Sequence, residues 1–131
     1  MDASGELVII GVDEEDESPP DVAQSAPGMV LPVTQGLFWE SDEEWKRGGE
    51  AGRAHGAFVL TRRNKLAGSL TFSLERGDLV ATGVLRFDGE KSFADGTLAL
   101  VGGTGEFRGK IGEVHVEARN PKRYRINTAD G

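Results

Sequence analysis

Few side chains in this sequence combine into a recognisable catalytic group. The chain has two histidines, His55 and His115, and no cysteine, which excludes thiol nucleophiles, thiolate metal sites and disulfides. Glu113, His115 and Glu117 alternate, so a strand would place all three on one face. Two carboxylates beside an imidazole could hold a metal ion, but a solvent-exposed strand face is the simpler interpretation, because no other metal-binding motif is present. We predict no metal site and no cofactor.

A glycine-rich segment, Gly102 to Lys110, invites comparison with nucleotide-binding loops. The dinucleotide fingerprint requires Gly where Arg108 stands, and the phosphate-binding loop requires Gly at Thr104 and Ser or Thr at Ile111. None of these is present, and the residues that follow have the pattern of a strand. We interpret the segment as a tight bend between two strands, where glycine supplies backbone angles that other residues avoid.

Alternation of apolar and polar residues marks the elements that must position any site. Leu70, Phe72 and Leu74 would lie on one face of a strand over residues 69–75, with hydroxyl residues on the other. Similar short runs recur, separated by turn-forming pairs such as Asp88-Gly89. Seven or eight such strands and no amphipathic helix predict an all-β fold. They favour an antiparallel barrel, because closure leaves no strand edge exposed.

The first 28 residues differ in composition from the rest. They contain eight acidic residues and no Lys or Arg, a charge of −8, whereas the whole chain carries −7. One apolar run, Leu7 to Ile10, lies within them, and the Pro-containing part after Asp13 is typical of a linker. We therefore divide the chain into an acidic N-terminal extension, 1–28, and a β-domain, 29–131. Residues 6–12 could alternatively pair as an edge strand.

Composition also limits the partners and the location. Net acidity argues against nucleic-acid binding, which needs clustered cations. The basic strip Lys122 to Arg125 is more simply an exposed strand face, or a docking strip for the acidic extension. No apolar run approaches the ~20 residues that span a bilayer, and the start of the chain lacks the features of a signal peptide. We expect a cytoplasmic protein that binds neither nucleic acid nor membrane.

The C-terminal half resembles a known barrel superfamily. Asp95 to Val114 contains Gly-Gly-Thr-Gly, then x-Phe-x-Gly, then a glycine-containing strand start, in an order similar to that of the allene oxide cyclase and dirigent barrels. Gly52 to Leu60, preceded by Trp45, is similar to the superfamily's entry into an earlier strand. The resemblance spans residues 35–127. It implies an eight-stranded antiparallel barrel with a central apolar cavity, assembled as a homodimer or other homo-oligomer.

Known members of that superfamily steer the cyclisation or coupling of reactive small molecules. Bacterial members of similar size include cyclases of spirotetronate and spirotetramate polyketides, which catalyse a Diels–Alder cycloaddition. The resemblance therefore implies a cofactor-free cyclase that folds a linear polyene polyketide. Such a reaction needs a shaped cavity and one or two donors to a carbonyl. Candidate catalytic donors are His115, Gln35 and Tyr124, and candidate substrate-binding residues are Trp39, Phe58, Phe72 and Thr82.

In one group of those cyclases an N-terminal extension closes over the product, which implies a lid here as well. The lid would be the apolar run of Leu7, Val8, Ile9 and Ile10, placed across the cavity mouth. Its acidic residues would dock on arginines of the barrel, namely Arg62, Arg63, Arg123 or Arg125.

Two other classes of function remain open. The same cavity could carry or protect a hydrophobic small molecule without changing it. The chain could also be an interaction module whose acidic extension binds a basic partner, and a barrel interior filled by side chains would favour that interpretation.

Overall fold

The computed structural model describes residues 5–13, 28–43, 45–61, 65–86, 94–117 and 122–130. They form eight strands and one short 3-10 helix. The strands are β1 (Gly5–Asp13), β2 (Val30–Glu40), β3 (Arg47–Thr61), β4 (Lys65–Leu74), β5 (Gly77–Arg86), β6 (Gly96–Gly103), β7 (Lys110–Glu117) and β8 (Lys122–Asp130). The 3-10 helix η2 (Gly105–Phe107) connects β6 to β7.

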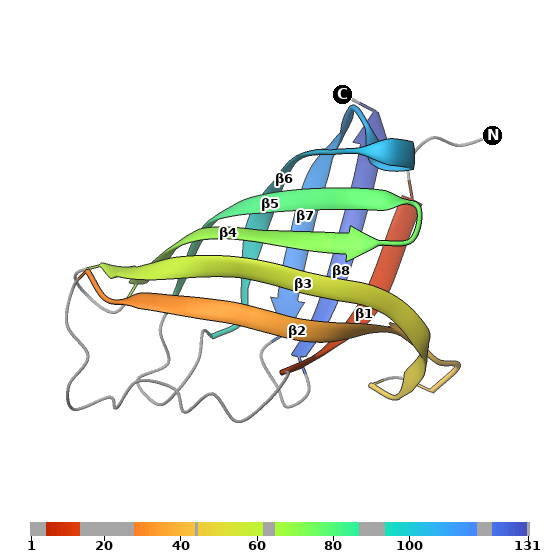
Figure 1. Cartoon of the computed structure of the whole chain (residues 1–131), viewed down its shortest axis with the longest axis horizontal. Helices are drawn as coiled ribbons and strands as arrows, with labels where there is room; N and C mark the ends of the chain where they lie inside the picture. Colours follow the sequence, from red (N-terminus) through yellow and green to blue (C-terminus); the bar gives the residue numbers. More distant parts are fainter. Residues whose placement is uncertain are drawn as a thin grey trace.

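The strands follow one another around a closed antiparallel barrel, in which β8 returns to pair with β1. Figure 1 shows β2 to β5 curving across the front and β7, β8 and β1 crossing behind them. Closure satisfies the backbone groups that an open sheet would leave at its edges. The predicted eight-stranded antiparallel barrel is therefore confirmed. Within the described ranges, no helix has the length and apolar character needed to cross a membrane.

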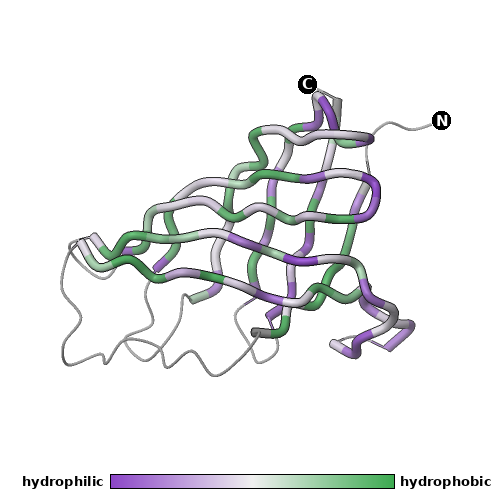
Figure 2. The backbone as a smooth tube through the Cα atoms, in the orientation of Figure 1, coloured by the Kyte–Doolittle hydropathy of each residue, from purple (hydrophilic) through white to green (hydrophobic). Residues whose placement is uncertain are grey.

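The barrel interior is a packed core. Along β4, Leu70, Phe72 and Leu74 point inward as the alternation predicts, and the strands change repeatedly between apolar and polar colours in Figure 2. An eight-stranded barrel is just wide enough for side chains to fill it. The central apolar cavity that the family resemblance implied is instead occupied. The largest fully buried side chains include Tyr124, Phe58, Phe72, Ile9, Leu37, Leu66, Leu70, Leu79, Leu85, Leu98 and Ile126.

The glycine-rich segment Gly102 to Lys110 is a tight bend, as predicted. It comprises the end of β6, the helix η2 and the start of β7, and it packs on the turn between β4 and β5. The Thr104 N–H donates to the Asp78 carbonyl at 2.9 Å. Gly105 has a φ of +60°, and a Cβ there would lie 2.5 Å from the Arg76 carbonyl oxygen. Only glycine fits that approach without moving backbone.

The division of the chain at residue 28 is wrong for the residues that the structure describes. Residues 5–13 are the strand β1, which pairs with β2 on one side and β8 on the other. The alternative that residues 6–12 form a strand is correct, although a closed barrel gives that strand no free edge. Residues 14–27, where we predicted the acidic linker, lie outside the described residues.

Candidate functional site

A pocket of about 370 Å³ opens at one mouth of the barrel. It lies where the β4–β5 turn, the helix η2, the start of β1 and the end of β2 come together, at the right of Figure 1. Its lining is mostly apolar, with two charged residues at the β4–β5 turn. The lining residues are Leu7, Trp39, Ala51, Leu74, Glu75, Arg76 and Phe107.

The apolar walls of this mouth pocket come from the ends of strands and from η2. Leu7 and Leu74 follow the inward alternation of β1 and β4 and pack with the core. Trp39 lies opposite Ile9 in the β1–β2 register and stays 38% exposed. The pairing of β2 with β3 is irregular just before and after Phe38, and such bulges often re-aim side chains beside binding sites. Trp39 therefore presents an aromatic surface to the pocket.

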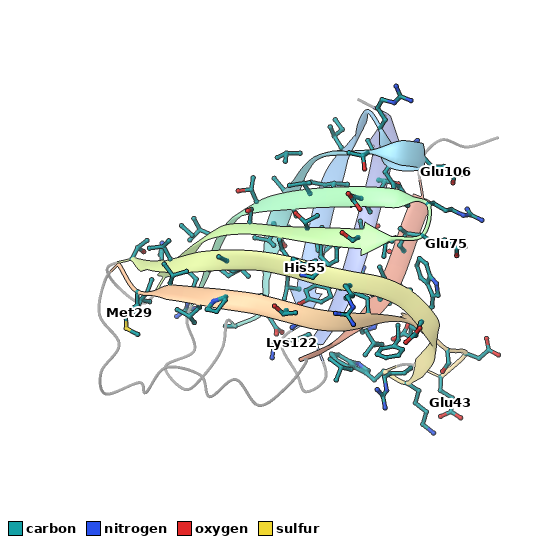
Figure 3. The ribbon with its side chains drawn as sticks, viewed as in Figure 1. Met29, Glu43, His55, Glu75, Glu106 and Lys122 are labelled. Atoms are coloured by element: carbon teal, nitrogen blue, oxygen red, sulfur yellow. The ribbon has the colours of Figure 1, made fainter. Side chains whose placement is uncertain are left out.

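The charged rim of the pocket is loosely held. Arg76 Nε lies 3.7 Å from Glu106 Oε2, and both side chains are largely exposed. Figure 3 labels Glu75 and Glu106 along this rim. An exposed ion pair of this kind contributes little to stability, so the Arg76 guanidinium can turn toward a polar group of a bound molecule at small cost.

Two predicted catalytic residues meet inside the barrel, but they bond to each other. The Tyr124 hydroxyl donates to Gln35 Oε1 at 2.6 Å, and both residues are buried. The Phe72 ring packs edge-on to Tyr124 with centroids 5.1 Å apart. Among the described residues, no buried side-chain nitrogen or oxygen lacks a partner. The pair therefore offers a packed, satisfied hydrogen bond rather than a donor aimed at a ligand.

His115, the third predicted catalytic residue, is on the outside of the barrel. Its neighbours Val114 and Val116 are buried inside, so the imidazole points outward. Its Nδ1 lies 3.1 Å from Thr97 Oγ1, and its Nε2 lies 4.0 Å from Glu113. The exposed strand face that we preferred for Glu113, His115 and Glu117 is thus correct, and His115 lies on the opposite side of the barrel wall from the other two candidate donors, Gln35 and Tyr124. No group of three potential metal ligands is assembled among the described residues.

Of the four predicted substrate-binding residues, Trp39 alone lines the mouth pocket. Thr82 points outward and donates to the Gly68 carbonyl at 2.9 Å, because its neighbour Ala81 is the buried one. Phe58 and Phe72 are fully buried parts of the core. Val80 and Val84, which share a face of β5 with Thr82, also lie on the outside of the barrel.

The predicted lid residues are part of the barrel wall. Ile9 is fully buried in the core, and Leu7 packs against the core and lines the pocket. Ile10 is also fully buried although it points outward, and Val8 is partly buried beside it. A segment hydrogen-bonded along both edges cannot open as a hinged flap without breaking the barrel, so the lid interpretation is wrong.

An ion cluster on the outer wall links β8 to β2 across β1. Arg123 Nε and Nη2 bond both carboxylate oxygens of Glu40 at 2.6 and 3.0 Å, and its Nη1 lies 2.6 Å from Glu117. The backbone N–H of Trp45 also donates to Glu40 Oε2, at 2.9 Å. The Arg123 hydrogen bonds hold the pKa of Glu40 below its ordinary value, and Glu40 in turn raises the pKa of Arg123.

The predicted docking of the acidic extension involves the same strand, β8. Arg123 contacts Glu40 and Glu117 of the barrel. Arg125 does lie 3.8 Å from Glu6, an acid of the N-terminal stretch, through two side chains that are about half exposed. Arg62 and Arg63 lie outside the described residues.

Most of the mouth pocket could not be recognised from the sequence. Leu74 was recognised as inward-facing, but Glu75, Arg76 and Phe107 were not connected with it. The signal was present in part: Leu74 ends an interior row directly before the Glu75-Arg76 turn. The sequence could not show that η2 folds onto that turn, which brings Phe107 and Leu74 into the lining of one pocket.

Comparisons with known proteins support the fold. No protein-family model matches the chain, and no curated protein matches it either. Among solved structures, the chain is similar to one described as a pyocyanin demethylase, with a TM-score of 0.72 and 21% sequence identity. The match covers 95% of this chain and 100% of that chain. At this identity the likeness establishes a shared barrel fold and leaves the chemistry open.

Proposed function

We propose that this barrel binds a compact, largely apolar small molecule in its mouth pocket. The observation that carries the proposal is the pocket itself, with Trp39 and Phe107 as aromatic walls and Arg76 at the rim. Ligand sites are typically apolar clefts with a few polar groups that orient the guest. The mouth pocket has that composition.

The size of the pocket favours a compact guest over a long chain. Its volume of about 370 Å³ lies near the lower end of the roughly 300–1,000 Å³ that ligand pockets span. The barrel core is packed with side chains that include Ile9, Leu37 and Phe72, which favours a guest held at the mouth. A planar guest could stack on the exposed Trp39 ring, and an anionic or carbonyl group on it could reach Arg76.

Trp39 provides a direct test, because the chain contains only two tryptophans. We expect a compact aromatic probe to quench the fluorescence of Trp39 in a saturable way. Pyocyanin, the molecule in the name of the structural neighbour, is a suitable probe. The Trp39→Phe variant should lose most of this quenching. The matched control, Trp45→Phe, should keep it, because Trp45 lies against Arg123 on the outer wall.

A second pair of variants tests the pocket volume. Ala51 lines the pocket and is 6% exposed, so Ala51→Leu should fill part of the space and weaken probe binding by on the order of tenfold. Ala129 is exposed on β8, and Ala129→Leu should leave binding unchanged. Equal affinities in the two variants, or no saturable binding in the wild type, would reject the mouth pocket as a ligand site. The latter outcome would favour an interaction module.

The finer proposal concerns what happens to the bound molecule. A Diels–Alder cyclase would need only to hold a polyene in its reactive conformer, and the family resemblance supports that activity. The packed core and the small pocket favour a carrier, or an enzyme for a smaller substrate. Incubation with a linear polyene tetramate tests the cyclase, since a cyclase changes the retention time and ultraviolet spectrum at unchanged mass. A carrier, or an enzyme for a smaller substrate, returns the compound as it was.

A further inference from the structure

A second pocket, of about 210 Å³, lies on the outer wall of the barrel where β1, β2 and β3 run side by side. Gly36 of β2 lies between Val12 of β1 and Arg53 of β3 in the strand register. Leu37 and Ala54 are fully buried in the core, so Gly36 and Arg53, their neighbours in sequence, face outward. Because Gly36 has no side chain, the wall is hollow between the other two residues. We call this site the outer pocket.

An irregularity in the pairing of β2 with β3 separates the outer pocket from the mouth pocket. Leu37 lies opposite Gly52 and Phe38 lies opposite Glu50, so Ala51 is an extra residue on β3. Such a bulge bends the strand that carries it, and Figure 1 shows β3 curving at this end. Ala51 lines the mouth pocket, whereas Phe38 and Glu50 line the outer pocket. The two pockets therefore lie on opposite sides of one stretch of the barrel wall.

Two arginines make the outer pocket electropositive. Arg47 and Arg53 line it together with Glu50, which gives these three side chains a formal charge of +1 on a chain whose net charge is −7. Both arginines are exposed. A guanidinium presents a planar fork of N–H donors that matches the two oxygens of a carboxylate. The charge and the donor geometry both favour an anionic group on the ligand.

Apolar side chains form the remaining walls of the outer pocket. Val12 and Phe38 line it and are partly buried. Arg47 Cζ lies 4.9 Å from the centre of the Phe38 ring, a distance at which a guanidinium and an aromatic ring attract each other. This contact keeps the Arg47 guanidinium at the pocket instead of extended into solvent. A ligand that combines an apolar ring with an anionic group finds a partner for each here.

The volume limits the ligand to a small molecule. Pockets for drug-sized ligands span roughly 300–1,000 Å³, and the outer pocket, at about 210 Å³, is smaller. We propose that the outer pocket is a second ligand site, which takes a small aromatic monocarboxylate. The carboxylate binds Arg47 and Arg53, and the ring lies over Gly36 against Val12 and Phe38.

Glu50 restricts the ligand further. Its carboxylate lines the same pocket and repels a second negative group on the ligand. Benzoate should therefore bind better than phthalate, which carries two carboxylates on the same ring. This site is separate from the mouth pocket, and the proposal does not depend on the mouth pocket binding a ligand.

An NMR titration of the full, isotope-labelled chain with benzoate tests the proposal. We expect saturable shifts of the backbone amide signals of Gly36, Gly52 and Arg53, which line the outer pocket. Benzamide, a neutral molecule of similar shape, should bind more weakly by roughly tenfold or more, because it brings no negative charge to the arginines. Both titrations are made at one ionic strength, so that general screening by salt is the same in each.

Substitutions of single arginines locate the bound carboxylate. Arg53→Gln should weaken benzoate binding by roughly tenfold or more, and Arg53→Lys should recover part of that loss, because it restores the charge without the fork. Arg47→Gln tests the second cation in the same way. The matched control is Arg86→Gln, the same change at the exposed last residue of β5, which should bind benzoate as the wild type does. The spectrum of each variant shows directly whether it is folded.

Three results would overturn the proposal. The first is a lack of saturable shifts at the outer pocket, including a titration whose shifts are confined to Arg76 and Phe107 at the mouth. The second is equal binding of benzoate and benzamide, because the arginines would then not recognise the carboxylate. The third is a loss of binding that is equal in Arg47→Gln, Arg53→Gln and Arg86→Gln, since it would then reflect the net charge alone.

Discussion

Two bridges connect β8 to β2 on opposite sides of β1, and their chemistry differs. Inside the barrel the Tyr124 hydroxyl donates to Gln35 Oε1 at 2.6 Å. Outside, Arg123 and Glu40 form a bidentate ion pair, with Nε 2.6 Å from Oε2. Tyr124 and Arg123 are consecutive residues of one strand, so they point to opposite faces. The strand between, β1, is enclosed from both sides.

Each bridge packs against a different residue of β1. A Cβ at Gly11 would lie 2.5 Å from Gln35 Oε1 and 2.7 Å from Tyr124 Cε2, so the inner bridge requires glycine there. On the outer side, Ile10 lies in register with Arg123 and is fully buried. The inner bridge is neutral and dry, whereas the outer one is charged and still reaches solvent. We expect the stabilisation by the inner bridge to depend on both partners being present. The stabilisation by the outer bridge should depend on salt and pH.

The largest effect on stability is expected from Ile10→Ala. This variant distinguishes a strand of the barrel from a detachable lid. Loss of a fully buried isoleucine side chain should lower the free energy of unfolding by about 2–5 kcal/mol. Chemical denaturation measures this directly. A stability equal to that of the wild type is what a detachable lid would give, and it would contradict the enclosure of β1.

A smaller effect is expected at the inner bridge. Tyr124→Phe leaves the Gln35 oxygen without its donor in a dry interior, which should cost about 1–3 kcal/mol of stability. The double variant Tyr124→Phe/Gln35→Leu removes both partners and should recover part of that loss. If the stability losses of the two single variants add up to that of the double variant, the hydrogen bond contributes no coupling energy between Tyr124 and Gln35.

The outer bridge should contribute less, because water and salt reach it. Arg123→Met should cost about 1–2 kcal/mol, since it removes the cation that two part-buried carboxylates share. The loss should shrink as salt is raised. Denaturation at low and high ionic strength makes the comparison. A salt-independent loss would point to packing on Trp45 as the main contribution.

The same bridge predicts a pH dependence. The pKa of Glu40 is lower in the folded chain than its ordinary value of 4.5, so the unfolded chain binds the proton more readily. The stabilisation is therefore complete above that value and is lost as the pH falls through the folded pKa. Glu40→Gln should flatten this part of the acid limb, as unfolding followed from neutral to acidic pH would reveal. An unchanged acid limb would contradict the role of Glu40.

The smallest effect is expected for His115→Ala. The imidazole lies on the outer wall and is partly exposed, so stability should change by no more than about 0.5 kcal/mol. Probe binding at the mouth should not change at all. A marked loss of binding or turnover would restore His115 as a functional residue and contradict the placement of the site at the mouth.

The sequence was most informative where the alternation was regular. It predicted the inward row of Leu70, Phe72 and Leu74 and the bend at the glycine-rich segment, because both depend on local backbone geometry. It misplaced Thr82, whose pattern fits either face of a strand. For His115 it gave both an exposed strand face, which the structure confirms, and a cavity donor, which the structure does not support. It also separated residues 1–28 from the barrel, because a composition shift resembles a domain boundary even where a strand continues the sheet.

By itself, the sequence determined the all-β class and the tight bend at the glycine-rich segment, since strand period and turn chemistry are read within a few neighbouring residues. The tertiary structure alone decided that β1 closes the barrel, that Gln35 meets Tyr124 and that Arg123 meets Glu40. These residues are far apart in the chain, and closure of the barrel brings them together. The mouth pocket was likewise decided by the tertiary structure, because its walls come from the ends of strands that only the closed barrel places side by side.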